Sequence, residues 1–80
     1  MLIADNLQTI RKFYRMSQSQ LATMLNVGQP YIALIENGSR PLTNSLRERT
    51  MQALELTPSK LQSILDLDAE YKRKQSEIKI

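Results

Sequence analysis

Two helix starts and two helix stops lie close together between Ser17 and Gly38, so only short helices fit in this segment. Ser17 with Gln20 three residues later is the arrangement of a capping box, which predicts that a helix begins at about Gln18. The helix must end near Asn26, because asparagine tolerates the left-handed conformation that ends helices. The sequence therefore predicts one short helix followed at once by a tight turn.

A second short helix is predicted to follow this turn. Gln29 and Pro30 open it, because a proline in the first turn gives up only an N–H group that has no intrahelical partner. The Asn37-Gly38 turn signal closes it. Two short helices joined by such a turn are typical of a helix-turn-helix motif, and Ala22 supplies the small residue needed where the helices cross. The apolar packing positions of the motif are Leu21, Leu25, Val27, Ile32 and Ile35.

Helical periodicity predicts three further helices around this unit. The first runs from about Ile3 to Tyr14, the fourth is capped by Thr43 or Ser45 and runs to about Leu54, and the fifth starts at Thr57-Pro58. The predicted inward positions are Ile3, Leu7, Ile10 and either Phe13 or Tyr14 in the first helix, Leu46, Thr50, Ala53 and Leu54 in the fourth, and Leu61, Ile64 and Leu65 in the fifth.

Composition supports an all-α fold and argues against catalysis. The 80 residues are enough for one domain, and only two glycines and three prolines interrupt a chain rich in helix-forming residues. The chain has no cysteine and no histidine, which excludes disulfides and thiolate metal sites and removes the commonest general base. Glu36, Glu48 and Glu55 lie on different elements, so no pair of carboxylates is set up for acid–base chemistry. We expect no enzyme activity, no cofactor and no bound metal.

The charge distribution separates a basic body from a neutral tail. The net charge is +3, yet residues 66–80 carry four acidic and four basic side chains, so the positive charge belongs to residues 1–65. A basic body favours a polyanionic partner. We therefore expect a domain over residues 1–65 and a tail over residues 66–80. No apolar run is long enough to span a bilayer, and Asp5 stands where a signal peptide would carry lysines, so we expect a cytoplasmic protein with no membrane association.

The chain resembles the phage repressor and Cro type of helix-turn-helix domain, the XRE family. The resemblance rests on MSQSQLA at 16–22, VGQPYI at 27–32 and IENGSRP at 35–41, and it covers about residues 4–65. It implies an all-α, five-helix lambda-repressor-like DNA-binding domain. It also implies a sequence-specific transcriptional regulator of phage, plasmid or chromosome, in particular a repressor that binds an inverted-repeat operator in double-stranded DNA as a homodimer. The sequence departs from the family at Asn26 and Glu55, where glycine is frequent.

This resemblance places the second short helix in the major groove. Gln29 at its start is expected to pair with adenine, while a solvated helix start is the alternative. Gln18 is expected to contact a phosphate or base at the groove edge, or else to serve only in capping. Tyr31 is expected either to reach a phosphate or to brace the helix. Ala33 and Leu34 are apolar candidates for thymine methyl contacts, and Pro30 lies beside them.

The loop after this helix is expected to contact the sugar-phosphate backbone. Its candidates are Asn37, Ser39 and Arg40, of which Arg40 is the best phosphate ligand. More generic candidates on the helix surfaces, which would otherwise merely solvate the protein, are Arg11, Lys12, Arg15, Arg47 and Arg49.

A protein-interaction module is the alternative function. The same fold would then act as an antitoxin or as a modulator of another regulator, and it would bind a polypeptide through Pro30, Ala33 and Leu34. The salt dependence of binding distinguishes the two, because phosphate contacts weaken steeply with salt and an apolar interface does not. Because no ligand-binding domain is present, activity would be controlled by concentration, by proteolysis or by a protein partner.

The tail leaves two structures open. Leu61, Ile64, Tyr71 and Ile78 recur near multiples of seven, and residues 69–80 contain no glycine or proline, so the fifth helix can continue beyond residue 66. An isolated helix is marginal unless one side is buried. The tail is therefore either disordered or a helix ordered against a partner subunit. The resemblance favours the second, as a dimerisation extension with Tyr71 and Ile78 as contacts.

Overall fold

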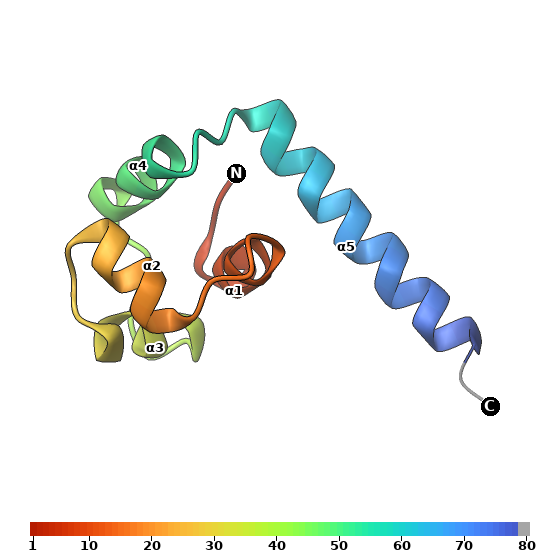
Figure 1. The fold of residues 1–80 in the computed structure, drawn as a ribbon, viewed down its shortest axis with the longest axis horizontal. Coiled ribbons are helices and arrows are strands. Elements are labelled where there is room, and N and C mark those ends of the chain that lie inside the picture. Colours follow the sequence, from red (N-terminus) through yellow and green to blue (C-terminus); the bar gives the residue numbers. More distant parts are fainter. Residues whose placement is uncertain (79–80) are drawn as a thin grey trace.

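The computed structural model describes the backbone of residues 1–78 and the side chains of residues 1–77, and this part of the chain is built from α-helices (Figure 1). The helices are α1 (Ala4–Phe13), α2 (Gln18–Leu25), α3 (Gln29–Glu36), α4 (Asn44–Ala53) and α5 (Pro58–Ile78). The predicted all-α, five-helix fold is confirmed. None of these helices combines the length and the apolar character needed to cross a membrane.

The start and end of α2 follow the predicted local signals. The Ser17 hydroxyl accepts a hydrogen bond from the Gln20 N–H at 3.0 Å, and the Gln20 side chain accepts one from the Ser17 N–H at 2.8 Å. Asn26 ends the helix in the left-handed conformation with φ +58°. The Val27 N–H then donates to the Ala22 carbonyl at 2.9 Å, which folds the chain back towards α3. The predicted capping box and the left-handed turn are confirmed.

The start and the end of α3 also lie where the sequence predicts them. Pro30 lies in its first turn, and Asn37 is its C-terminal cap. Gly38 follows with φ +85°, a conformation that a side chain would strain. The N–H groups of Ser39 and Arg40 both donate to the Leu34 carbonyl, at 2.9 and 3.1 Å, so the loop after α3 is tied to the helix.

The capping of α4 and α5 resolves what the sequence leaves open. Thr43, and not Ser45, caps α4, because its hydroxyl accepts a hydrogen bond from the Leu46 N–H at 3.2 Å. Glu55 has φ +52°, so the chain makes a left-handed turn after α4 at a residue other than glycine. The Thr57 hydroxyl accepts from the Lys60 N–H at 3.0 Å at the start of α5.

The core lies where all five helices meet, and two of the predicted inward positions, Ile3 and Ala53, are exposed. Leu2 is buried in place of Ile3, which is exposed, because the chain before α1 is extended and alternates its side chains. Tyr14 packs against the core while Phe13 is half exposed. Ala53 is exposed, although it was expected to point inward. The buried apolar residues are Leu2, Leu7, Ile10, Leu21, Ala22, Leu25, Ile32, Ile35, Leu42, Leu46, Leu54, Leu56, Leu61 and Ile64.

The fifth helix continues without a break across residue 66. Its first half packs against α1, and its second half extends away from the other helices (Figure 1). Residues 66–78 are therefore helical, and the predicted packing of this helix against a partner subunit stays a prediction. The side chain of Ile78 and the last two residues lie outside the described residues, so the predicted contact of Ile78 has no structural counterpart here.

Candidate nucleic-acid interface

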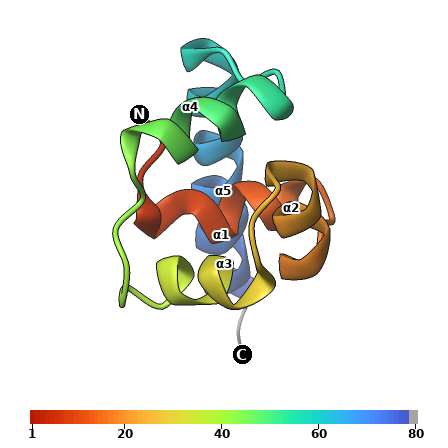
Figure 2. The ribbon, with the colours of Figure 1, turned by 90° about the vertical axis from the view of Figure 1, so that its left-hand side faces the viewer.

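The helices α2 and α3 pack against each other at one side of the molecule, joined by the turn at Asn26 (Figure 2). Ala22 is buried on α2, which agrees with the predicted close crossing of the two helices. Gln29 and Pro30 are exposed at the start of α3, while Ile32 and Ile35 are fully buried beneath it. The start of α3 is therefore exposed to solvent, while the opposite face of the helix packs into the core.

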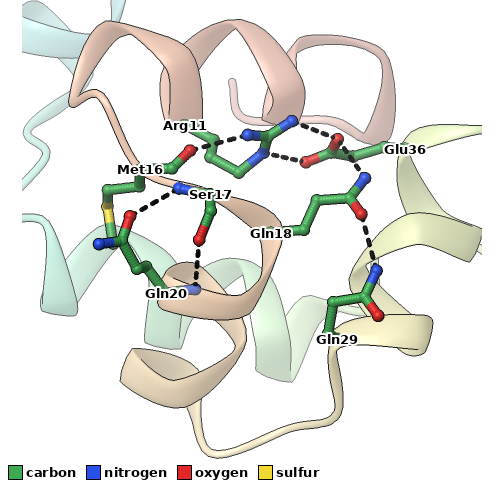
Figure 3. A network of polar contacts seen from close by, with 7 residues as sticks. All are labelled: Arg11, Met16, Ser17, Gln18, Gln20, Gln29 and Glu36. Atoms are coloured by element: carbon green, nitrogen blue, oxygen red, sulfur yellow. Dashed lines mark hydrogen bonds and ion pairs between the residues drawn. The ribbon is translucent and has the colours of Figure 1, made fainter.

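A buried ion pair lies behind this exposed helix start. Arg11 on α1 donates from Nε to Oε2 of Glu36 at 2.7 Å and from Nη2 to Oε1 at 2.9 Å (Figure 3). Its Nη1 donates to the Met16 carbonyl at 2.7 Å. The side chains of Arg11 and Glu36 are only 9% and 3% exposed. This two-pronged geometry is the strong form of a charged hydrogen bond, and it joins α1, the α1–α2 turn and α3.

The pKa of both partners reflects this contact. Burial disfavours the charged form of Glu36, but the hydrogen bonds from Arg11 and Gln18, together with the positive charges of Arg11 and Lys12, outweigh burial and lower the pKa of the carboxyl. The hydrogen bond to Glu36 raises the pKa of Arg11, against the opposing effect of burial. Glu36 is therefore an ionised group that accepts hydrogen bonds at neutral pH.

Two glutamines extend this contact to the surface. Gln18 donates from Nε2 to Oε1 of Glu36 at 3.1 Å, and Gln29 donates from Nε2 to Oε1 of Gln18 at 2.8 Å (Figure 3). Gln18 is half-buried and Gln29 is exposed. We call the four side chains Arg11, Glu36, Gln18 and Gln29 the polar relay. The relay runs from the interior to the start of α3.

The charge of Glu36 fixes the direction of every amide in the polar relay. An ionised carboxylate only accepts hydrogen bonds, so Gln18 must turn its NH2 group towards Glu36 and its oxygen outward. Gln29 must then turn its own NH2 group towards Gln18. This leaves Gln29 with a free Oε1 and one remaining N–H, both on an exposed side chain. The start of α3 thus presents one acceptor and one donor in a fixed order.

The other residues predicted on α3 lie in different surroundings. Pro30 and Leu34 are exposed, Leu34 by 37%, and Ala33 is half-buried. Tyr31 is half-buried and packs against the core, as expected if it braces the helix. The structure thus groups Gln29, Pro30 and Leu34 on the open surface and draws Tyr31 towards the interior.

The loop residues predicted to contact a backbone are all exposed. Asn37 uses its Oδ1 to accept the Ser39 N–H at 2.9 Å, which shapes the loop itself. Arg40 directly follows this turn and is exposed. The loop is therefore ordered by its own hydrogen bonds and displays a cation next to the end of α3.

Three of the five arginine and lysine positions named as generic candidates hold the fold together. Arg11 was expected on the exposed side of α1, but it is buried against Glu36, and this prediction is wrong. Arg47 donates to the Leu2 carbonyl at 2.6 Å, and Arg49 donates to the Leu25 carbonyl at 2.8 Å. Lys12 and Arg15 are exposed as expected.

The sequence contained a signal for the buried arginine. Arg11 lies four residues after Leu7 and directly after Ile10, which puts it on the inward face of α1. An inward arginine requires a partner, and Glu36 is the acidic residue that ends α3, directly after the buried Ile35. Among the described residues, no group of three or more His, Cys, Asp or Glu side chains is placed to hold a metal ion.

Comparison with known protein families agrees with the helix-turn-helix arrangement of α2 and α3. A family model described as Helix-turn-helix matches residues 7–61, which is more than half of the chain. No curated protein and no solved structure matches the chain. The matched residues include all of α2, the turn and α3, together with the whole polar relay.

Proposed function

Because the chain belongs to the XRE family of helix-turn-helix proteins and is a DNA-binding transcription regulator, we propose that it is a repressor that binds an inverted-repeat operator as a homodimer. In this proposal α3 enters the major groove and Gln29 reads a base. The observation that carries it is the polar relay, which fixes the donor and acceptor of an exposed glutamine at the start of α3.

The fixed order of groups on Gln29 matches adenine. Adenine presents an acceptor at N7 and a donor at N6 in the major groove. The free Oε1 of Gln29 would accept from N6, and its remaining N–H would donate to N7. Guanine presents two acceptors at the same edge, so it leaves Oε1 unpaired. We therefore propose that Gln29 selects adenine, with Pro30, Ala33 and Leu34 contacting neighbouring groove edges such as thymine methyl groups.

Phosphate contacts are assigned to the two ends of this unit. Arg40 lies exposed in the loop after α3, and Asn37 and Ser39 shape that loop. We propose that Arg40 binds one phosphate and that Gln18, beside Gln29, contacts another phosphate at the opposite edge of the groove. Tyr31 is assigned to bracing, because it packs against the core.

Homodimerisation follows from the small size of the contact. One α3 reaches only a few base pairs, which gives too little specificity for a single operator. Two copies related by a two-fold axis read two half-sites about one helical turn, or about 34 Å, apart. We therefore propose a palindromic operator.

A protein-interaction module remains the second candidate, and one observation favours it. The exposed surface of α3 carries Gln29, Pro30 and Leu34 and no charged side chain, since Glu36 is covered by Arg11. Such a surface also suits a polypeptide partner. In that case the protein would modulate another regulator or neutralise a toxin.

Selection of bound fragments from random duplex DNA tests the proposal. The expected result is a palindrome with an adenine at a symmetric position in each half-site, and repression of a reporter that carries it. Binding should weaken steeply as salt is raised, because released counterions drive phosphate binding. Recovery of no preferred sequence, or binding that is insensitive to salt, would overturn the DNA-reading proposal and favour the protein-interaction module.

A further inference from the structure

The exposed half of α5 carries an apolar stripe that is continuous with the core. Ile64 is buried, whereas Leu67 and Tyr71, three and seven residues further on, are 55% and 62% exposed. Phe13 at the end of α1 is also 50% exposed. These four residues line one groove of about 350 Å³ between α1 and α5. Exposed aromatic and aliphatic side chains that converge on a groove are typical of an interaction surface.

Charges between residues 66 and 74 of α5 are sorted along the helix around Tyr71, and Glu77 follows beyond them. Asp66, Asp68 and Glu70 precede it, and Lys72, Arg73 and Lys74 follow it. Two ion pairs join the halves within the helix, Lys72 to Asp68 at 3.0 Å and Lys74 to Glu70 at 3.4 Å. The helix therefore presents an acidic segment, an aromatic centre and a basic segment in that order.

These ion pairs lie on opposite sides of the apolar stripe. At 100° per residue, Asp68 and Lys72 fall on one side of the line through Leu67 and Tyr71, and Glu70 and Lys74 fall on the other. When two helices pack antiparallel, each side of the stripe meets the same side of the other helix. Two copies that cross near Tyr71 thus bring acidic residues towards basic residues on both sides.

The opposite orientation is disfavoured by the same charges. A parallel pair would place the acidic segment beside the acidic segment and the basic beside the basic, which is repulsive. A second copy of this chain is therefore complementary in charge to α5 when the two helices are antiparallel. An unrelated partner would need this charge order by coincidence.

We infer that a second copy of the chain docks in the groove between α1 and α5, with the two α5 helices antiparallel and crossing near Tyr71. Leu67, Tyr71 and Phe13 of each copy supply the apolar contact, and the acidic and basic segments set the orientation. The inference rests on the homodimer of the proposed function and identifies its surface and geometry.

Charge-reversal variants of the full chain test the pairing. The first carries Asp68→Lys and Glu70→Lys, and the second carries Lys72→Glu and Lys74→Glu. Each gives positions 68, 70, 72 and 74 charges of one sign, so sedimentation equilibrium should show the homodimer dissociation constant rising by about tenfold or more. An equimolar mixture should restore dimers, because the two segments are then opposite in charge. Unchanged homodimers in either variant would overturn the inference.

A fourfold exchange is the matched control for the stability of α5. The variant Asp68→Lys, Glu70→Lys, Lys72→Glu and Lys74→Glu keeps both ion pairs within the helix and reverses their direction. An antiparallel pair remains complementary, so this variant should form dimers as the unmodified chain does. Loss of its dimers would contradict the charge pairing.

Cysteine crosslinking tests the orientation, since the chain has no native cysteine. Leu67 and Gln75 lie four residues before and after Tyr71, so antiparallel helices bring residue 67 of one copy near residue 75 of the other. A mixture of Leu67→Cys and Gln75→Cys chains should give mixed dimers with a short bismaleimide crosslinker. Gln75→Cys alone should crosslink poorly. Efficient self-crosslinking of Gln75→Cys would indicate parallel helices and overturn the inference.

Binding to a single half-site separates failure of this inference from failure of the proposed function. A chain that binds half-site DNA but sediments as a monomer at all accessible concentrations overturns the antiparallel pair and leaves DNA reading in place. A chain that forms the antiparallel dimer but binds no preferred DNA sequence supports the pairing and overturns the proposed function.

Discussion

Gln29 donates a hydrogen bond from Nε2 to Oε1 of Gln18 at 2.8 Å, and Gln18 is in turn bonded to the buried Glu36. The exposed start of α3 is thereby connected to an ion pair in the interior. A glutamine held in this way loses less side-chain entropy when it binds a base than a free one would. The contact therefore links the packing of α1 and α3 to base selection.

Replacement of Gln29, the proposed base-reading residue, should weaken binding to the operator and leave binding to random DNA unchanged. Gln29→Ala is expected to weaken binding to the selected operator by about 1–3 kcal/mol and to relax the preference at one base pair of each half-site, the loss of one bidentate contact. Fluorescence anisotropy with operator and random duplexes measures this. Equal losses on both duplexes would remove Gln29 from base reading.

Loss of the relay glutamine should have a smaller effect at the same base pair. Gln18→Ala leaves Gln29 in place but frees its amide to rotate, so specific binding should weaken by about 1 kcal/mol. The double variant should lose less than the sum of the single losses, because the two side chains form one contact. Strict additivity in this double-mutant cycle would show that Gln18 acts independently of Gln29.

Arg40, in the loop after α3, should contribute equally to the affinity for every DNA sequence. Arg40→Ala is expected to weaken operator and random DNA to the same degree and to reduce the slope of log affinity against log salt by roughly one unit, the loss of one phosphate contact. Lys60→Ala, at an exposed position in the first turn of α5, is a control with the same change in charge. An unchanged salt slope in Arg40→Ala would mean that Arg40 is merely solvated.

Local signals predicted most of the fold because each acts over a few residues. Ser17 with Gln20 caps α2, Asn26 ends it, and Pro30 opens α3, each through bonds within one helical turn. The same signals were ambiguous for α4, where Thr43 and Ser45 both suit a cap. Only the geometry of the preceding loop decides between them.

Contacts between residues far apart in the sequence could not be predicted from local sequence patterns. Arg11 and Glu36 lie 25 residues apart, and their pairing depends on how α1 packs on α3. The candidate site was therefore predicted as a set of separate residues. Gln18 and Gln29 were both placed in the motif, but the hydrogen bond between them was not predicted. Arg15 has φ +56°, which no local residue preference indicates.

Enlargement of the residue at the crossing of α2 and α3 should destabilise the motif. Ala22 is 2% exposed, so Ala22→Leu forces the helices apart and should cost about 1–3 kcal/mol, which lowers Tm by several degrees in a domain of this size. Thr23→Leu, at the exposed neighbouring position, should leave Tm nearly unchanged. Thermal unfolding followed by circular dichroism measures both. An unchanged Tm for Ala22→Leu would contradict the close crossing.

The buried carboxylate should make stability depend on pH. Glu36→Gln leaves Arg11 without its charged partner and is expected to lower the free energy of unfolding by about 3 kcal/mol near neutral pH. Because the folded-state pKa of Glu36 is lowered, its contribution is complete above the unfolded value of about 4.3 and is lost as the pH falls through the folded value.

The difference between the unmodified chain and Glu36→Gln should therefore shrink in acid. A protonated glutamate resembles glutamine in size and charge, and the titration of all other carboxylates is common to both proteins. Urea unfolding at about pH 7 and about pH 3 measures the difference. Glu48→Gln, at an exposed position on α4, should change stability by less than about 0.5 kcal/mol at either pH. A constant difference across this range would show that the charge of Glu36 does not stabilise the fold, and the polar relay would then lack the fixed direction that base selection requires.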